Sequence, residues 1–139
     1  MYIKRLDEME MSGVPAQYDA QVAGNLFGAL MGSVAKAWEF HLLTGSYAEH
    51  DALDTYYHDI IGHTDDLIEH YIASHGKEGL VFGNVQLDTT SAVSYFESLK
   101  SIVHQYRDGL FADDSIAVSD IDDILGLIEG TLYKLTNLS

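Results

Sequence analysis

One stretch of the sequence, residues 41–69, combines histidines and carboxylates at spacings that could place them along one edge of a helix. Because successive residues on an α-helix are rotated by about 100°, the members of this set fall within roughly a quarter of the helix circumference. The set consists of His50, Asp54, His58, Asp65 and Glu69, with His41 just upstream. Imidazole nitrogens and carboxylate oxygens are ligands of transition metals such as iron. The spacing therefore predicts a metal site along this edge.

Apolar periodicity and turn signals predict the helices that must carry these side chains. Thr44-Gly45 is a stop signal, and Ser46 followed by Glu49 is a capping-box pattern that opens the next helix. We expect Asp88, Thr89 or Thr90 to cap the third helix and Ser119 to cap the fourth. The helices are expected over about 15–43, 46–74, 88–109 and 119–138.

Four helices of similar length predict an all-α fold, a ferritin-like four-helix bundle. The connection between the second and third helices is the longer one, as a crossover requires. Residues 1–14 are interpreted as an N-terminal lead-in and residues 15–139 as the bundle. Small residues on the first helix are expected to allow the close approach of another helix: Gly24, Gly28, Gly32, Ala35 and Ala37.

Composition excludes several classes of protein and partner. The net charge of −15, from 22 acidic residues against 7 Lys and Arg, argues against nucleic acid as a partner, and the basic pair Lys4-Arg5 is too little for a DNA-binding arm. The absence of cysteine excludes disulfides and thiolate metal sites. No apolar run reaches the roughly 18 residues that a membrane span needs. A cytoplasmic location is the default expectation.

The segments His41-Leu-Leu-Thr-Gly45, His50-x-x-x-Asp54 and Asp65-x-x-x-Glu69 resemble the ferroxidase signature of the Dps mini-ferritins. In that family a histidine late in the first helix is followed by a His-x-x-x-Asp pair early in the second. An Asp-x-x-x-Glu pair comes eleven residues after that aspartate, and the same step separates Asp54 from Asp65. The resemblance covers most of the chain, although its specific part is residues 41–69.

The resemblance implies a homo-oligomer that oxidises Fe(II), preferably with hydrogen peroxide, at a site between subunits. The minimum assembly is a dimer, and the family forms a hollow dodecamer that stores ferric mineral. The implied ligands are His41, His50 and Asp54 from one subunit and Asp65 and Glu69 from a two-fold partner. We expect His58 as an extra or substitute ligand and zinc as a substitute metal.

Two other interpretations remain open. The first is a non-enzymatic structural or interaction module with a single-metal or vestigial site, because the loop between His41 and His50 is shorter than usual in the family and His70 replaces a usual arginine. The second is a haemerythrin-like carrier, although further histidine pairs are missing from the other helices. Because no Glu-x-x-His motif occurs, we do not expect an iron pair inside the bundle.

The remaining aromatic and titratable residues are expected to have ordinary structural roles. Trp38 and Tyr57 are expected in the core. The surface or an interface is expected for His63, His70 and His75. Helix capping or the lining of an iron-entry pore is expected for Asp113, Asp114 and Asp120.

Overall fold

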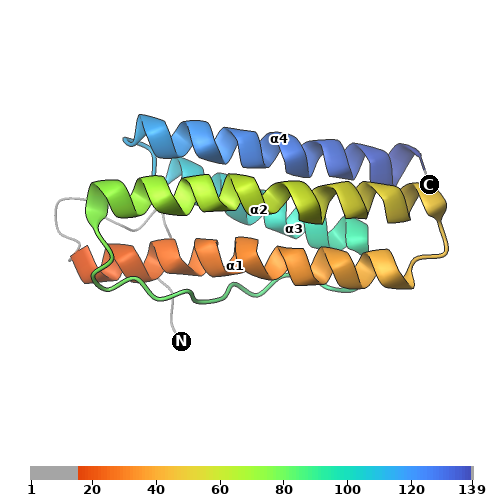
Figure 1. Cartoon of the computed structure of the whole chain (residues 1–139), viewed down its shortest axis with the longest axis horizontal. Helices are drawn as coiled ribbons and strands as arrows, with labels where there is room; N and C mark the ends of the chain where they lie inside the picture. Colours follow the sequence, from red (N-terminus) through yellow and green to blue (C-terminus); the bar gives the residue numbers. More distant parts are fainter. Residues whose placement is uncertain (1–15, 139) are drawn as a thin grey trace.

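A computed structural model describes residues 16–138 and contains four packed helices (Figure 1). The helices are α1 (Ala16–Leu43), α2 (Tyr47–His75), α3 (Ala92–Asp108) and α4 (Ser115–Asn137). The predicted all-α four-helix bundle is confirmed. The expected lead-in over residues 1–14, with Lys4 and Arg5, lies outside the described residues, as do Pro15 and Ser139. Within the described residues, no helix is long and apolar enough to cross a membrane.

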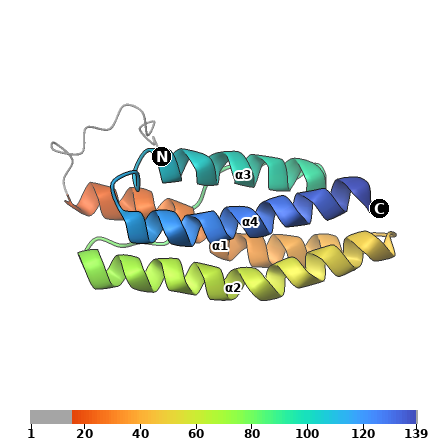
Figure 2. The ribbon, with the colours of Figure 1, turned by 90° about the horizontal axis from the view of Figure 1, so that it is seen from above.

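The chain direction is set by one long connection. Helices α1 and α2 form an antiparallel pair, and residues 76–91 then run along α1 before α3 begins (Figure 1). As a result α2 and α3 run in the same direction, and α4 returns beside them (Figure 2). Contacts connect α1 with α2, α2 with α4, α4 with α3 and α3 with α1. The long crossover predicted between the second and third helices is therefore present.

The ends of α2 follow the predicted signals. The Ser46 side chain accepts the backbone N–H of Glu49, which satisfies one of the unpaired donors of the first turn. At the other end Gly76 has a φ of 79°, a value that glycine adopts without steric cost. Its N–H donates to the carbonyl of Ile72 and closes the helix.

The predicted cap of α3 was wrong. Ser91 is the N-cap, and its side chain accepts the N–H of Ser94. Asp88 is engaged upstream, where its carboxylate accepts both the N–H and the hydroxyl of Thr90, at 2.9 and 2.7 Å. The carboxylate therefore closes a local turn and leaves the helix start to Ser91.

The predicted start of α4 was also wrong. Asp114, not Ser119, is the N-cap, because its carboxylate accepts the N–H of Ala117 at 3.1 Å. The helix then begins at Ser115, and Ser119 lies within it. Two capping residues five positions apart were available here, and the carboxylate of Asp114 accepts an N–H of the first turn.

The apolar faces of all four helices meet in one core. Its largest fully buried side chains are Leu26, Phe27, Leu30, Leu53, Tyr56, Ile60, Leu67, Phe96, Leu99, Ile121, Ile124 and Ile128. One polar contact crosses it: the Ser33 hydroxyl donates to the Leu30 carbonyl at 2.6 Å and lies 2.7 Å from the Tyr56 hydroxyl. Since Ser33 has a single proton, Tyr56 must be the donor between the two. Burial raises the pKa of Tyr56 well above its usual value.

The small residues of α1 have a different role from the one predicted. Gly24 and Gly28 receive the backbone of the crossover, because a Cβ at either position would overlap the carbonyl oxygen of Val81 or Gly83. The Gly83 N–H donates to the Gly24 carbonyl at 3.0 Å. Gly32, one turn further on, has open space at its Cβ position. At Gly24 and Gly28 the segment in close approach is therefore the crossover connection, and not a helix.

Candidate metal centre

His41 and His50 form a reciprocal pair at one end of the bundle. Their rings stack with centroids 3.6 Å apart. Nδ1 of His41 lies 2.8 Å from the carbonyl oxygen of His50, and Nδ1 of His50 lies 2.9 Å from the carbonyl oxygen of His41. Because a carbonyl only accepts, each Nδ1 carries a proton, and each neutral ring keeps its lone pair on Nε2. This is the tautomer that a metal-ligating histidine needs.

The short connection between α1 and α2 holds this pair together. The N–H of Thr44 donates to the Phe40 carbonyl and ends α1. The N–H of Ser46 donates to the Thr44 hydroxyl, so this donor does not use the Glu49 side chain that a full capping box would supply. These bonds place the last turn of α1 against the first turn of α2. His41 is buried there, and His50 is partly exposed.

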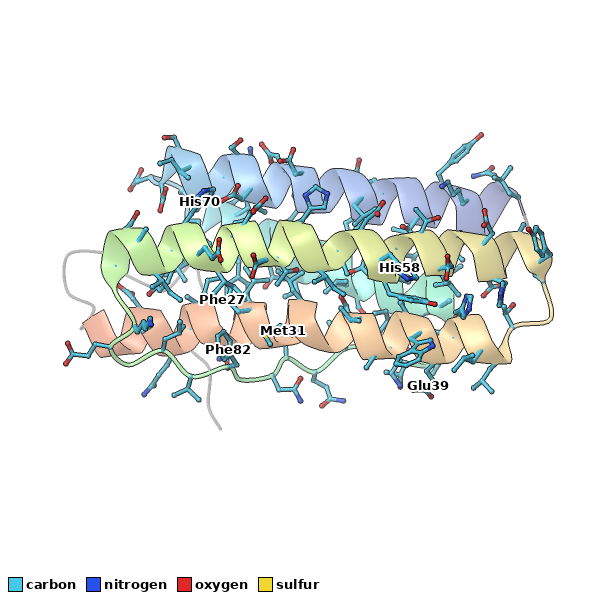
Figure 3. All side chains as sticks on the ribbon, in the orientation of Figure 1. Phe27, Met31, Glu39, His58, His70 and Phe82 are labelled. Atoms are coloured by element: carbon cyan, nitrogen blue, oxygen red, sulfur yellow. The ribbon has the colours of Figure 1, made fainter. Side chains whose placement is uncertain are left out.

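Asp54 follows one turn after His50 and already has a partner. The Tyr57 hydroxyl donates to its carboxylate at 2.8 Å, and desolvation together with this bond raises the pKa of Tyr57. The Tyr57 ring also meets His41 edge-on, with centroids 5.4 Å apart. His58 is exposed and donates from Nδ1 to the Asp54 carbonyl at 2.8 Å (Figure 3). Its Nε2 therefore also keeps a free lone pair.

Asp65 and Glu69 lie in a second group further along α2. Together with Asp66 they form a set of three residues whose ligand atoms lie within 4.8 Å of one another. Between positions 16 and 138, no other set of three or more His, Cys, Asp or Glu residues meets this condition. All three side chains are exposed. Asp66 was not among the predicted ligands, although its i,i+3 spacing to Glu69 was a usable signal.

The predicted ligands thus form two groups within one chain. Eleven residues separate Asp54 from Asp65, which corresponds to about 16 Å along the axis of α2 at 1.5 Å per residue. That distance is several times the length of a metal–ligand bond. Within one chain, the histidines near Asp54 and the carboxylates near Asp65 cannot bind the same ion.

Other histidines of α2 make contacts between helices, in keeping with the surface roles expected for them. His70 Nδ1 lies 2.6 Å from the Asp120 carboxylate of α4, and this hydrogen bond raises the pKa of His70 (Figure 3). His75 Nε2 lies 3.8 Å from the carboxylate of Asp114. Asp114 and Asp120 are therefore engaged in a helix cap and in contacts with histidines.

The prediction that Trp38 lies in the core was wrong. It is 53% exposed, because Ala37 and His41 take the inward positions on that part of α1. Tyr57, also expected in the core, is half-buried, with its ring 6.2 Å from that of Trp38. Several large apolar side chains beside the histidine pair are exposed. We call them the apolar surface: Trp38, Leu42, Leu43 and Tyr47.

Comparison with known proteins places the chain in a family. A family model described as a family of unknown function, DUF5856, matches residues 41–135. The match begins at His41 and includes α2, α3 and most of α4. No curated protein and no solved structure matches the chain. Because the matched residues make up more than half of the sequence, the chain belongs to DUF5856, a family of unknown function.

Proposed function

We propose that this protein binds Fe(II) and oxidises it with hydrogen peroxide at a site shared by two copies of the chain. The observation that carries the proposal is the reciprocal pair of His41 and His50, which leaves both Nε2 lone pairs free for a metal. The pair lies on the stretch that resembles the Dps signature. An acidic chain also attracts cations, because its net charge of −15 produces a favourable field.

The two groups on α2 support a site between copies. A two-fold axis perpendicular to α2 would place the helices antiparallel, so that the Asp54 region of one copy faces the Asp65 region of the other. The exposed Trp38 and Leu42 lie beside the histidine pair, and contiguous apolar side chains on a protein surface often mark a contact. A homo-dimer is the smallest assembly that completes the site. A dodecamer is the assembly that the resemblance implies.

Each residue has a chemical role in this proposal. His41 and His50 supply nitrogen ligands, and Asp54, Asp65 and Glu69 supply oxygen ligands, a mixed set that suits iron. Two Fe(II) ions each lose one electron, and one hydrogen peroxide takes up both electrons and two protons to give two water molecules. The Fe(III) produced would then be stored as mineral. His58 would be a further nitrogen ligand, one turn after Asp54.

The direct test is an anaerobic Fe(II) titration of the purified apo-protein, followed by peroxide, with ferric absorbance recorded over time. We expect saturable binding of one or two irons per subunit and rapid oxidation. The double variant Asp65→Ala, Glu69→Ala should lose binding and remain folded, because both side chains are exposed. Asp59→Ala, which removes another exposed carboxylate of α2, is the matched control. Unchanged iron binding in the double variant would reject the assignment.

A mixing experiment tests the shared site itself. His50→Phe keeps an aromatic ring against His41 and removes one ligand nitrogen. Neither this variant nor Asp65→Ala, Glu69→Ala should oxidise iron alone. In a hybrid dimer one of the two sites is intact. Each hybrid should therefore show up to half of the activity of an unchanged dimer. If mixing restores nothing although hybrids form, the ligands are not shared in this way.

One observation favours a second candidate, a non-enzymatic module that holds a single metal such as zinc. Among the described residues, Asp65, Asp66 and Glu69 alone bring three ligand atoms together, while the Asp54 carboxylate is engaged by Tyr57. This candidate predicts zinc binding that depends on Asp66. It also predicts no peroxide-driven oxidation of Fe(II). A stopped-flow trace of ferric absorbance separates the two candidates.

A further inference from the structure

A cavity lies at the end of the bundle opposite the histidine pair. It has a volume of about 210 Å³ and opens between the start of α1, the end of α2 and the connection from α3 to α4. Tyr71, Leu110 and Phe111 form its apolar walls, and Asp19 and Asp113 are among its acidic lining residues. The proposed iron site uses none of these residues.

Aromatic rings surround part of this cavity. The Tyr71 ring meets Phe111 edge-on with centroids 6.4 Å apart, and the His75 ring lies 4.6 Å from that of Tyr71. The faces of aromatic rings carry partial negative charge and attract organic cations. The cavity walls are therefore apolar and also attract positive charge.

Asp19 lines this cavity, and one oxygen of its carboxylate is buried and unsatisfied. Its Oδ1 is inaccessible to solvent and has no hydrogen-bond partner. Burial raises the pKa of Asp19, and the nearby His75 opposes that shift. A buried charged acceptor without a donor costs free energy, and a cation beside this carboxylate offsets part of that cost by charge attraction.

The other charged groups around the cavity keep the site acidic. Asp114 accepts the N–H of Ala117, and its second carboxylate oxygen lies 3.8 Å from His75 Nε2. Asp113 is exposed near the mouth. Among the described residues, neither lysine nor arginine lines the cavity. The described lining therefore offers several carboxylates to a cation, and His75 is its one basic side chain.

The spacing of the acidic groups favours an organic cation over a metal ion. A metal ion requires several ligand atoms at about 2.0 to 2.6 Å from one centre. Among the described residues, the ligand atoms of Asp19, His75 and Asp114 do not gather within 4.8 Å of one another. An ammonium group on an alkyl chain uses both features of the cavity, because its head donates to carboxylates and its chain covers apolar walls.

We propose that this cavity binds a primary alkylammonium ion. The ammonium group pairs with the negatively charged carboxylate of Asp19, and the alkyl chain lies against Tyr71 and Phe111. The ring of Tyr71 adds cation–π attraction to the head group. This binding is independent of the iron chemistry proposed above.

The test is a calorimetric titration of the full chain with n-butylammonium chloride at constant ionic strength. Saturable binding is expected, while n-butanol, which has a similar shape without the charge, should give no saturable heat. Asp19→Asn should weaken binding roughly tenfold or more, which corresponds to about 1.4 kcal/mol. Asp59→Asn, which removes one exposed carboxylate remote from the cavity, should bind as the unchanged chain does.

Asp19→Asn is expected to fold, because it removes a charge that has no partner at Oδ1 and keeps the side-chain shape. Far-ultraviolet circular dichroism checks this directly. Absence of saturable binding to the unchanged chain would overturn the proposal, and so would equal affinity in folded Asp19→Asn. Zinc chloride titrated in place of n-butylammonium provides a third check. Zinc binding that is lost in Asp19→Asn, without butylammonium binding, would reassign the cavity to a metal.

Discussion

The two halves of α1 meet the rest of the chain in different ways. In the first half, the crossover backbone presses on Gly24 and Gly28 so closely that no side chain fits between them. In the second half, Trp38 and Leu42 are 53% and 65% exposed. The first half has its partner within the same chain. The second half presents a surface without such cover, beside the two histidines with free ring nitrogens.

The comparison shows how one helix can serve both folding and association. Contact with the crossover requires the smallest residues, since backbone must approach backbone. Contact with a separate molecule is favoured by large apolar side chains, which bury more area. The buried pair of Ser33 and Tyr56 lies between these two halves and joins α1 to α2. The residue sizes along α1 therefore match the kind of partner that we infer for each half.

The largest expected effect comes from the covered half of α1. Gly28→Ala should lower the free energy of unfolding by roughly 2 to 3 kcal/mol, because the added methyl overlaps the carbonyl oxygen of Gly83. Urea unfolding followed by circular dichroism measures the change. Gly32→Ala is the control, and it should be neutral or stabilising by up to about 1 kcal/mol, since its site is open and alanine favours helix. Similar values for both variants would show that the crossover does not constrain α1.

The next effect concerns the exposed half. The double variant Trp38→Ser, Leu42→Ser should raise the dissociation constant of self-association roughly tenfold or more, because it removes apolar area from the proposed contact between copies. Analytical ultracentrifugation measures it. The free energy of unfolding of the monomer should change by less than about 0.5 kcal/mol per site, as for exposed positions generally. Unchanged self-association would contradict the inference that the second half of α1 contacts another copy of the chain.

A smaller effect is expected where the halves meet. Tyr56→Phe removes the hydroxyl that donates to Ser33 and should cost about 1 kcal/mol of unfolding free energy. Ser33→Ala should cost a similar amount, since it leaves the Tyr56 donor unpaired in the core. The double variant should cost less than the sum, because the two side chains share one bond. Additive effects in this cycle would mean that the pair does not join the helices.

The smallest effect lies at the beginning of α1 and depends on pH. Burial raises the pKa of Asp19 in the folded state above its usual value of 3.8, so ionised Asp19 disfavours folding. The penalty is absent below the unfolded pKa, develops as the pH rises through the folded pKa and is complete above it. Asp19→Asn should therefore be more stable than the unchanged chain at about pH 7, and this advantage should shrink towards about pH 3. Chemical unfolding at both pH values measures the change, and an advantage independent of pH would contradict it.

Local sequence signals identified most of the helix boundaries and the fold class. Ser46 and Gly76 bound α2 as predicted, since capping depends on hydrogen bonds within a few residues. The starts of α3 and α4 were misplaced, because several neighbouring residues were able to cap each helix. At α4 the carboxylate of Asp114 accepts the N–H of Ala117, and Ser119 is part of the helix.

The candidate metal residues were found only in part from the sequence. Helical periodicity placed Asp54, Asp65 and Glu69 on one edge of α2, but periodicity describes angle and not distance along the axis. Periodicity alone therefore predicted one strip, whereas the resemblance to the Dps signature assigned its two ends to different subunits. The stacking of His41 on His50 depends on how the connection between two helices folds, which periodicity within one helix does not describe.

The sequence by itself determined the all-α class, the bounds of α2 and the residue types that are suited to iron, because these depend on composition and on neighbours within a few residues. Only the tertiary structure decided that Gly24 and Gly28 face the crossover, that Trp38 is exposed and that Asp19 meets Tyr71 and His75 at one cavity. These features arise between segments that are distant in the chain. Their geometry follows from how the helices pack, which no single segment encodes.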